Sequence, residues 1–129
     1  MSSRSAKTKN GHVTTEEYEE SGKNVFDAIV LKGKSGNHGL PDYSHTPNRK
    51  YIKENSDGTF REMRVHDENG KAIFEIGYHA EESLTNNRHE KVLHYHYIGD
   101  NFERSPAIKL EKNTSVYDEY KKYLEEYGL

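Results

Sequence analysis

The chain has 129 residues, with 19 Lys and Arg against 22 Asp and Glu and a formal net charge of −3 with His neutral, which suits one small domain. The near-neutral charge excludes the broad basic field of a general DNA-coating protein, and the absence of Cys excludes disulfides and thiolate zinc sites. No apolar run approaches the ~20 residues that cross a bilayer and no secretory signal is evident, so we expect a cytoplasmic protein with no membrane partner.

The N-terminal third is predicted to be helical after a frayed start. Residues 1–13 are rich in Ser and Lys and are expected to be a flexible N-terminus. A helix is predicted over about 14–32, because Thr14 and Glu17 form a capping-box pattern and the apolar residues that follow share one helix side. Gly and Pro then recur through residues 33–58, which is typical of loops.

The clearest local signal is a β-hairpin. Asn69-Gly70 predicts a two-residue type I′ turn, because both central positions of that turn need positive φ. The flanking segments Thr59–His66 and Ala72–His79 are rich in strand-forming residues. Such a turn sets the following opposing pairs: Val65 with Phe74, Met63 with Ile76, Arg64 with Glu75, and Phe60 with His79. One side of this hairpin is mostly apolar, and the other carries charge and His.

A third strand and a final helix complete the prediction. The strand over Lys91–Ile98 alternates, so that its apolar and imidazole side chains point to opposite faces: Leu93, Tyr95 and Tyr97 on one, His94 and His96 on the other. Ser115 opens a helix that runs to about Tyr127, with a single apolar stripe. We therefore expect an α+β fold: an antiparallel three- to four-stranded β-meander with an N-terminal helix and a C-terminal helix packed on one face, all in one domain over 14–129.

The polar face of this sheet is the predicted functional surface. Alternate residues of a strand lie about 6–7 Å apart on the same face, so imidazoles, carboxylates and guanidinium groups gather there. The candidate catalytic residues are His79, His94, His96, Arg64, Glu75 and Arg104.

These residue types fit metal-independent cleavage of RNA. The reaction needs a base for the 2′-OH, an acid for the leaving oxygen and cations for the charge that develops on phosphorus. His79 would form the acid–base pair with His94 or His96, because imidazole exchanges protons near neutral pH. Arg64 or Arg104 would hold the phosphate, and Glu75 would orient an imidazole. This chemistry needs no cofactor, and its partner is RNA.

The same surface has three other interpretations. His94-Tyr95-His96 places two imidazoles on one side of a strand, so that His94 and His96 could bind a metal, with His79 or Glu75 completing the site. The chain could instead be a non-catalytic phage accessory protein that binds a protein partner, such as a phage structural protein. Finally, Arg64 and Glu75 could be a cross-strand pair on a solvated face with no function in chemistry.

Several short motifs suggest a family. They are Arg64-x-His66-Asp67-x-x-Gly70-Lys71, Ile76-x-Tyr78-His79, His94-x-His96 and Arg104-Ser105. Together they resemble small C-terminal domains of bacterial polymorphic toxins and of phage proteins, some attached to head-morphogenesis proteins. The likeness covers about residues 47–129. It implies a compact α+β module with ribonuclease-type activity, with the matching positions at Arg64, His79, His94, His96 and Arg104.

Overall fold

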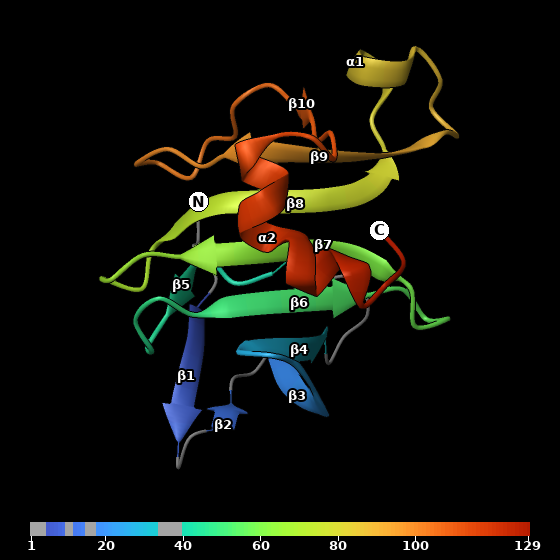
Figure 1. Cartoon of the computed structure of the whole chain (residues 1–129). Coiled ribbons are helices and arrows are strands. Elements are labelled where there is room, and N and C mark those ends of the chain that lie inside the picture. The colour runs from blue at the N-terminus through green and yellow to red at the C-terminus, as the bar shows by residue number, and fades with distance from the viewer. Residues whose placement is uncertain (1–4, 10–11, 15–17, 34–39) are drawn as a thin grey trace.

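The computed structural model describes residues 5–9, 12–14, 18–33 and 40–129. Its elements are β1 (Ser5–Lys9), β2 (His12–Thr14), β3 (Tyr18–Val25), β4 (Ala28–Gly33), β5 (Tyr43–Ser44), β6 (Lys50–Glu54), β7 (Phe60–His66), β8 (Ala72–Ala80), α1 (Glu82–Thr85), β9 (Lys91–Tyr97), β10 (Ile108–Lys109) and α2 (Ser115–Glu125). These strands form one mixed sheet in the order β10-β9-β8-β7-β6-β4-β3-β2-β1-β5. The β4–β6 and β1–β5 pairs are parallel and the others antiparallel. The fold is thus α+β, with α2 lying across one face of the sheet (Figure 1).

The predicted fold is wrong in its N-terminal part and in the size of its sheet. Residues 18–32 of the expected helix lie in the β3–β4 hairpin and Thr14 lies in β2, while residues 15–17 lie outside the described part of the chain. Phe26 adopts φ 55° at the hairpin turn and Gly22 adopts φ 88° where the β3–β4 register shifts, two backbone conformations that a helix does not contain. The sheet is therefore larger than a three- to four-stranded meander, because these strands extend it beyond β6.

The expected flexible N-terminus is described only in part. Residues 5–9 and 12–14 form β1 and β2, and residues 1–4 and 10–11 lie outside the described residues. Within the described ranges, no helix is long and apolar enough to span a membrane.

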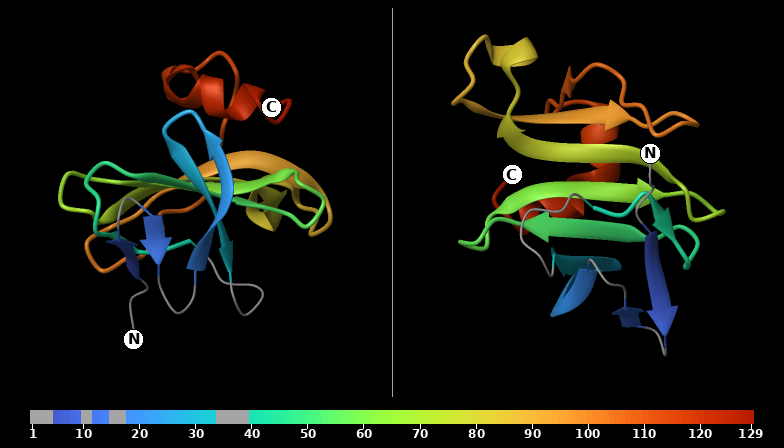
Figure 2. Two further views of the ribbon diagram at one scale, coloured as in Figure 1. Left: turned by 90° about the horizontal axis from the view of Figure 1, so that it is seen from below. Right: turned by 180° about the vertical axis from the view of Figure 1, so that it is seen from behind.

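The core lies between the sheet and α2. Thr114 caps the helix, its side chain accepting a hydrogen bond from the Tyr117 backbone N–H at 3.3 Å. The helix buries one stripe against the sheet: Tyr117, Tyr120, Tyr123 and Leu124. These side chains pack with apolar residues of the facing strands: Val30, Ile52, Phe60, Met63, Val65, Phe74 and Ile76. The tip of the β3–β4 hairpin also reaches α2 (Figure 2). The rings of Phe26 and Tyr123 meet edge to face at this contact.

The central hairpin has the predicted register but a different turn. Met63 pairs with Ile76, Arg64 with Glu75 and Val65 with Phe74. Only Gly70 of the Asn69-Gly70 pair has positive φ, and the Asp67 N–H donates to the Lys71 carbonyl, so the loop has three residues rather than two. A register shift between Val65 and His66 offsets the extra residue. The predicted pairs of Met63, Arg64 and Val65 therefore hold.

A second irregularity lies at the other end of β7. Lys53 pairs with Glu62 and Glu54 pairs with Phe60, which leaves Arg61 as the extra residue of a bulge. Phe60 consequently lies in the core beneath α2 and not opposite His79 on the polar face, as the turn had predicted. Because of the bulge, Arg61 and Glu62 are both available to the polar face.

Candidate functional site

The polar face combines residues of β7, β8 and β9. In the β8–β9 pairing Glu75 lies opposite His96 and Gly77 opposite His94, while β7 places Arg64 opposite Glu75 and Glu62 opposite Gly77. His94 and His96 thus share a face with Arg64, Glu75 and His79, as the strand alternation predicted. Leu93 and Tyr95 lie on the other face, where they pack against the core beneath α2.

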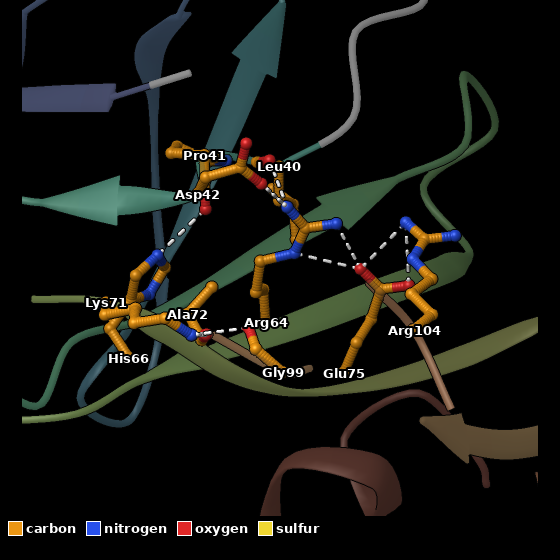
Figure 3. A network of polar contacts seen from close by, with 10 residues as sticks. All are labelled: Leu40, Pro41, Asp42, Arg64, His66, Lys71, Ala72, Glu75, Gly99 and Arg104. Carbon is orange, nitrogen blue, oxygen red and sulfur yellow. Dashed lines mark hydrogen bonds and ion pairs between the residues drawn. The ribbon is translucent and has the colours of Figure 1, made fainter. Parts of the chain in front are cut away.

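Arg64 and Glu75 form a buried ion pair rather than an exposed one. Their side chains are 2% and 1% exposed, and both Nε and Nη2 of Arg64 donate to Glu75 Oε2. Arg64 Nη1 donates to Asp42 Oδ1 at 2.9 Å and to the Leu40 carbonyl at 2.7 Å (Figure 3). All its contacts are therefore to the protein, so Arg64 is not presented to a ligand. The phosphate-binding role predicted for it does not fit this environment, and neither does a solvated cross-strand pair.

Arg104 approaches the same carboxylate from outside. Its Nη2 lies 3.1 Å from Glu75 Oε1, and its side chain remains 46% exposed. One edge of the Arg104 guanidinium therefore pairs with the Glu75 carboxylate (Figure 3). The rest of the side chain is partly open to solvent. Glu75 is held between the guanidinium groups of Arg64 and Arg104, and it has no hydrogen bond to an imidazole among the described residues. The predicted role of Glu75 in orienting an imidazole is therefore not part of this arrangement.

The three predicted histidines do lie together. The ring centroids of His79 and His94 are 4.7 Å apart, and those of His94 and His96 are 5.3 Å apart. In each ring Nδ1 lies within hydrogen-bond distance of a backbone carbonyl: Ala80 at 3.1 Å from His79, Val92 at 2.8 Å from His94 and Ser105 at 2.7 Å from His96. Because a carbonyl only accepts, Nδ1 carries a proton in all three rings, so that Nε2 is the nitrogen that has a lone pair whenever a ring is neutral.

The three histidines differ in exposure. His94 is fully buried and its Nε2 has no hydrogen-bond partner in the described structure, whereas His79 is half-buried. Burial lowers the pKa of His94 below its ordinary value, and the neighbouring imidazole of His79 adds to the effect, against the opposing hydrogen bond to Val92. His94 is therefore neutral at pH 7.

Gly77 provides the space in which two of these rings meet. A Cβ on Gly77 would lie 2.8 Å from His79 Nε2 and 3.1 Å from His94 Nε2. Any larger residue at this position would thus displace the imidazoles.

A cleft of about 540 Å³ opens beside His79. Its lining comprises Lys53, Glu54, Asn55, Ser56, Arg61, Glu62, His79 and Arg104. Of the predicted site residues, His79 and Arg104 line this cleft, while Arg64, Glu75, His94 and His96 do not. Glu62 is 6% exposed, and its strand position opposite Gly77 places it diagonally from His79 on the same face. The cleft therefore combines two carboxylates, one imidazole, two guanidinium groups and the ammonium group of Lys53.

Three residues of this region were not predicted as site residues: Arg61, Glu62 and Glu81. Arg61 reaches the cleft because of the bulge, for which the sequence contains no recognisable signal. Glu81 follows β8 directly and approaches His94 and His96, so that one ligand atom of each lies within 4.8 Å of the others. A hydrogen bond from the Ser83 hydroxyl lowers the pKa of Glu81, and this carboxylate is ionised at neutral pH. In the sequence, the feature that could have indicated Glu81 was its position two residues after His79.

Comparisons with known proteins do not assign the chain to a class. No protein-family model, curated protein or solved structure matches it. The arrangement of side chains in the cleft therefore has to support any functional assignment.

Proposed function

We propose that this protein is a ribonuclease that cleaves RNA without a metal, with its active site in the cleft of Glu62, His79, Arg61 and Arg104. The observation that carries the proposal is that one cleft collects a carboxylate, an imidazole and two guanidinium groups from β7, β8 and the segment after β9. The likeness of the short sequence motifs to toxin and phage domains points to the same activity.

Glu62 is the general base of the proposed reaction. Its carboxylate takes the proton of the 2′-OH, and O2′ then attacks phosphorus, forming the P–O2′ bond as the P–O5′ bond breaks. The products are a 2′,3′-cyclic phosphate and a 5′-hydroxyl end. This role falls to Glu62 rather than to His94 because His94 is fully buried and does not line the cleft.

His79 is the general acid. Its Nδ1–H donates to the Ala80 carbonyl, which fixes the ring, and its Nε2 lies over Gly77. In the imidazolium form Nε2–H delivers the proton to the departing O5′. Imidazole suits this step because it both holds and releases a proton near neutral pH.

Arg104 and Arg61 bind the phosphate. Guanidinium groups match the geometry of phosphate oxygens and stabilise the charge that develops on them in the transition state. Arg104 is held in place by Glu75 and keeps its outer edge exposed. The buried ion pair of Arg64 and Glu75 thus supports the site indirectly, by positioning Arg104.

The test uses a labelled RNA oligonucleotide incubated with the untagged protein in EDTA. We expect cleavage with cyclic phosphate ends, no cleavage of the all-deoxy oligonucleotide, and losses of about 10²- to 10⁴-fold for His79→Ala and for Glu62→Gln. His89→Ala is the matched control, because His89 is an exposed imidazole in the loop before β9. Cleavage that both active-site variants retain, or the absence of any turnover by a folded protein, would overturn the proposal and favour a non-catalytic interaction protein.

A further inference from the structure

A second cluster of polar side chains lies next to His79, and its residues do not line the cleft. Glu81, His94 and His96 each offer one ligand atom, and these atoms lie within 4.8 Å of one another. The two histidines are alternate residues of β9, and the carboxylate comes from the connection between β8 and α1. We propose that Glu81, His94 and His96 form a binding site for a divalent transition metal ion, with zinc as its representative.

The burial of His94 is the first argument. Its side chain is fully buried, and its Nε2 has no hydrogen-bond partner among the described residues. A buried polar atom without a partner is unfavourable and is uncommon in folded proteins. A metal ion held also by Glu81 and His96 satisfies this lone pair.

The tautomers are the second argument. Nδ1 of His94 donates to the Val92 carbonyl and Nδ1 of His96 to the Ser105 carbonyl, at 2.8 and 2.7 Å. Histidines that bind metals almost always donate the other ring N–H in this way, because it fixes the ring and leaves the ligating nitrogen free. Both rings are therefore oriented as ligands before any ion arrives.

The ligand types decide the class of ion. Two imidazoles and one carboxylate suit zinc and its neighbours in the first transition row, whereas calcium and magnesium prefer sites built from oxygen alone. Three protein ligands leave a coordination position for water. The absent Cβ of Gly77 keeps space next to His94 Nε2, and His79 Nε2 borders the same space.

This site is independent of the proposed nuclease chemistry. Glu62 and the two cleft arginines take no part in it, and RNA cleavage in EDTA does not require it. Binding is therefore measured on the protein alone, without any activity readout.

The test is isothermal titration of the untagged, metal-free chain with zinc chloride, together with the visible spectrum of the cobalt complex. We expect one equivalent of zinc to bind, cobalt bands typical of a low-coordinate nitrogen and oxygen site, and at least about tenfold weaker binding for Glu81→Gln and for His96→Gln. Glu82→Gln and His89→Gln are the matched controls, because both side chains are exposed and lie near the cluster in sequence.

Glu81 lies at the surface end of the cluster, so Glu81→Gln keeps the fold, which circular dichroism checks. Substoichiometric zinc, or binding that Glu81→Gln and His96→Gln leave unchanged, overturns the metal site. Either result leaves the ribonuclease proposal standing, because its assay contains EDTA.

Discussion

Replacing Arg64 by Met should cost far more stability than its position on a polar sheet face suggests. The substitution removes two donors to Glu75, one to Asp42 and one to the Leu40 carbonyl. Glu75 would stay 1% exposed, with only Arg104 at 3.1 Å to balance its charge. Breaking a buried ion pair by removing one partner typically costs about 3–5 kcal/mol, and the remaining contact with Arg104 places the expected loss near the lower figure.

The assay is urea unfolding followed by circular dichroism, with Arg88→Met as the control because Arg88 is exposed in the loop before β9. The control should change the free energy of unfolding by less than about 0.5 kcal/mol. The double variant Arg64→Met, Glu75→Leu should recover at least about 1 kcal/mol, since it leaves no buried carboxylate behind. A loss below about 1 kcal/mol for Arg64→Met, or no recovery in the double variant, would refute the reasoning.

Three further predictions concern buried positions in β7, in β8 and in the loop that joins them. Gly70→Ala should destabilise the fold by more than about 2 kcal/mol in urea, because the new Cβ would lie 2.0 Å from the Ser44 carbonyl oxygen at a residue with φ 78°; wild-type stability would contradict this close approach. Gly77→Ala should reduce RNA cleavage at least about tenfold while costing only about 1–3 kcal/mol of stability, since its Cβ displaces the His79 ring; undiminished cleavage would show that the ring position is not critical. Burial lowers the pKa of His66, against the opposing effect of its two backbone carbonyl contacts. The unfolded chain therefore binds more protons than the folded one, and the free energy of unfolding should fall as the pH decreases below about 6.5. If His66→Gln and the wild-type protein lost stability equally with falling pH, this assignment would be contradicted.

The sequence predicted the central strands well because their signals are local. Alternation in Ala72–Ala80 and Lys91–Tyr97 placed His79, His94 and His96 on the face opposite the core, as the structure has them. The N-terminal hairpin was missed because its apolar residues also fit a helix, and only its backbone at Gly22 and Phe26 distinguishes the two. Spacing alone does not separate these patterns in so short a segment.

The functional site was predicted only in part because its remaining features are long-range. The burial of Arg64 depends on Leu40 and Asp42, more than twenty residues earlier in the chain. Glu62 shares the face of Arg64 by strand alternation, whereas the entry of Arg61 into the cleft depends on a one-residue bulge between β6 and β7. Neither the contacts of Arg64 with Leu40 and Asp42 nor the bulge has a signature within its own segment, so the sequence indicated the histidines and Arg104 but not the burial of Arg64 or the entry of Arg61.

The most direct test of the account is the chemical identity of the RNA ends produced in EDTA by the wild-type protein and by Glu62→Gln. The proposed cleft predicts 2′,3′-cyclic phosphate and 5′-hydroxyl ends from the wild-type protein, and at least about a hundredfold slower cleavage by the variant, because Gln keeps the shape of Glu62 and cannot take the 2′-OH proton. A wild-type protein that leaves the RNA intact, or a Glu62→Gln protein that cleaves at the wild-type rate, would contradict it.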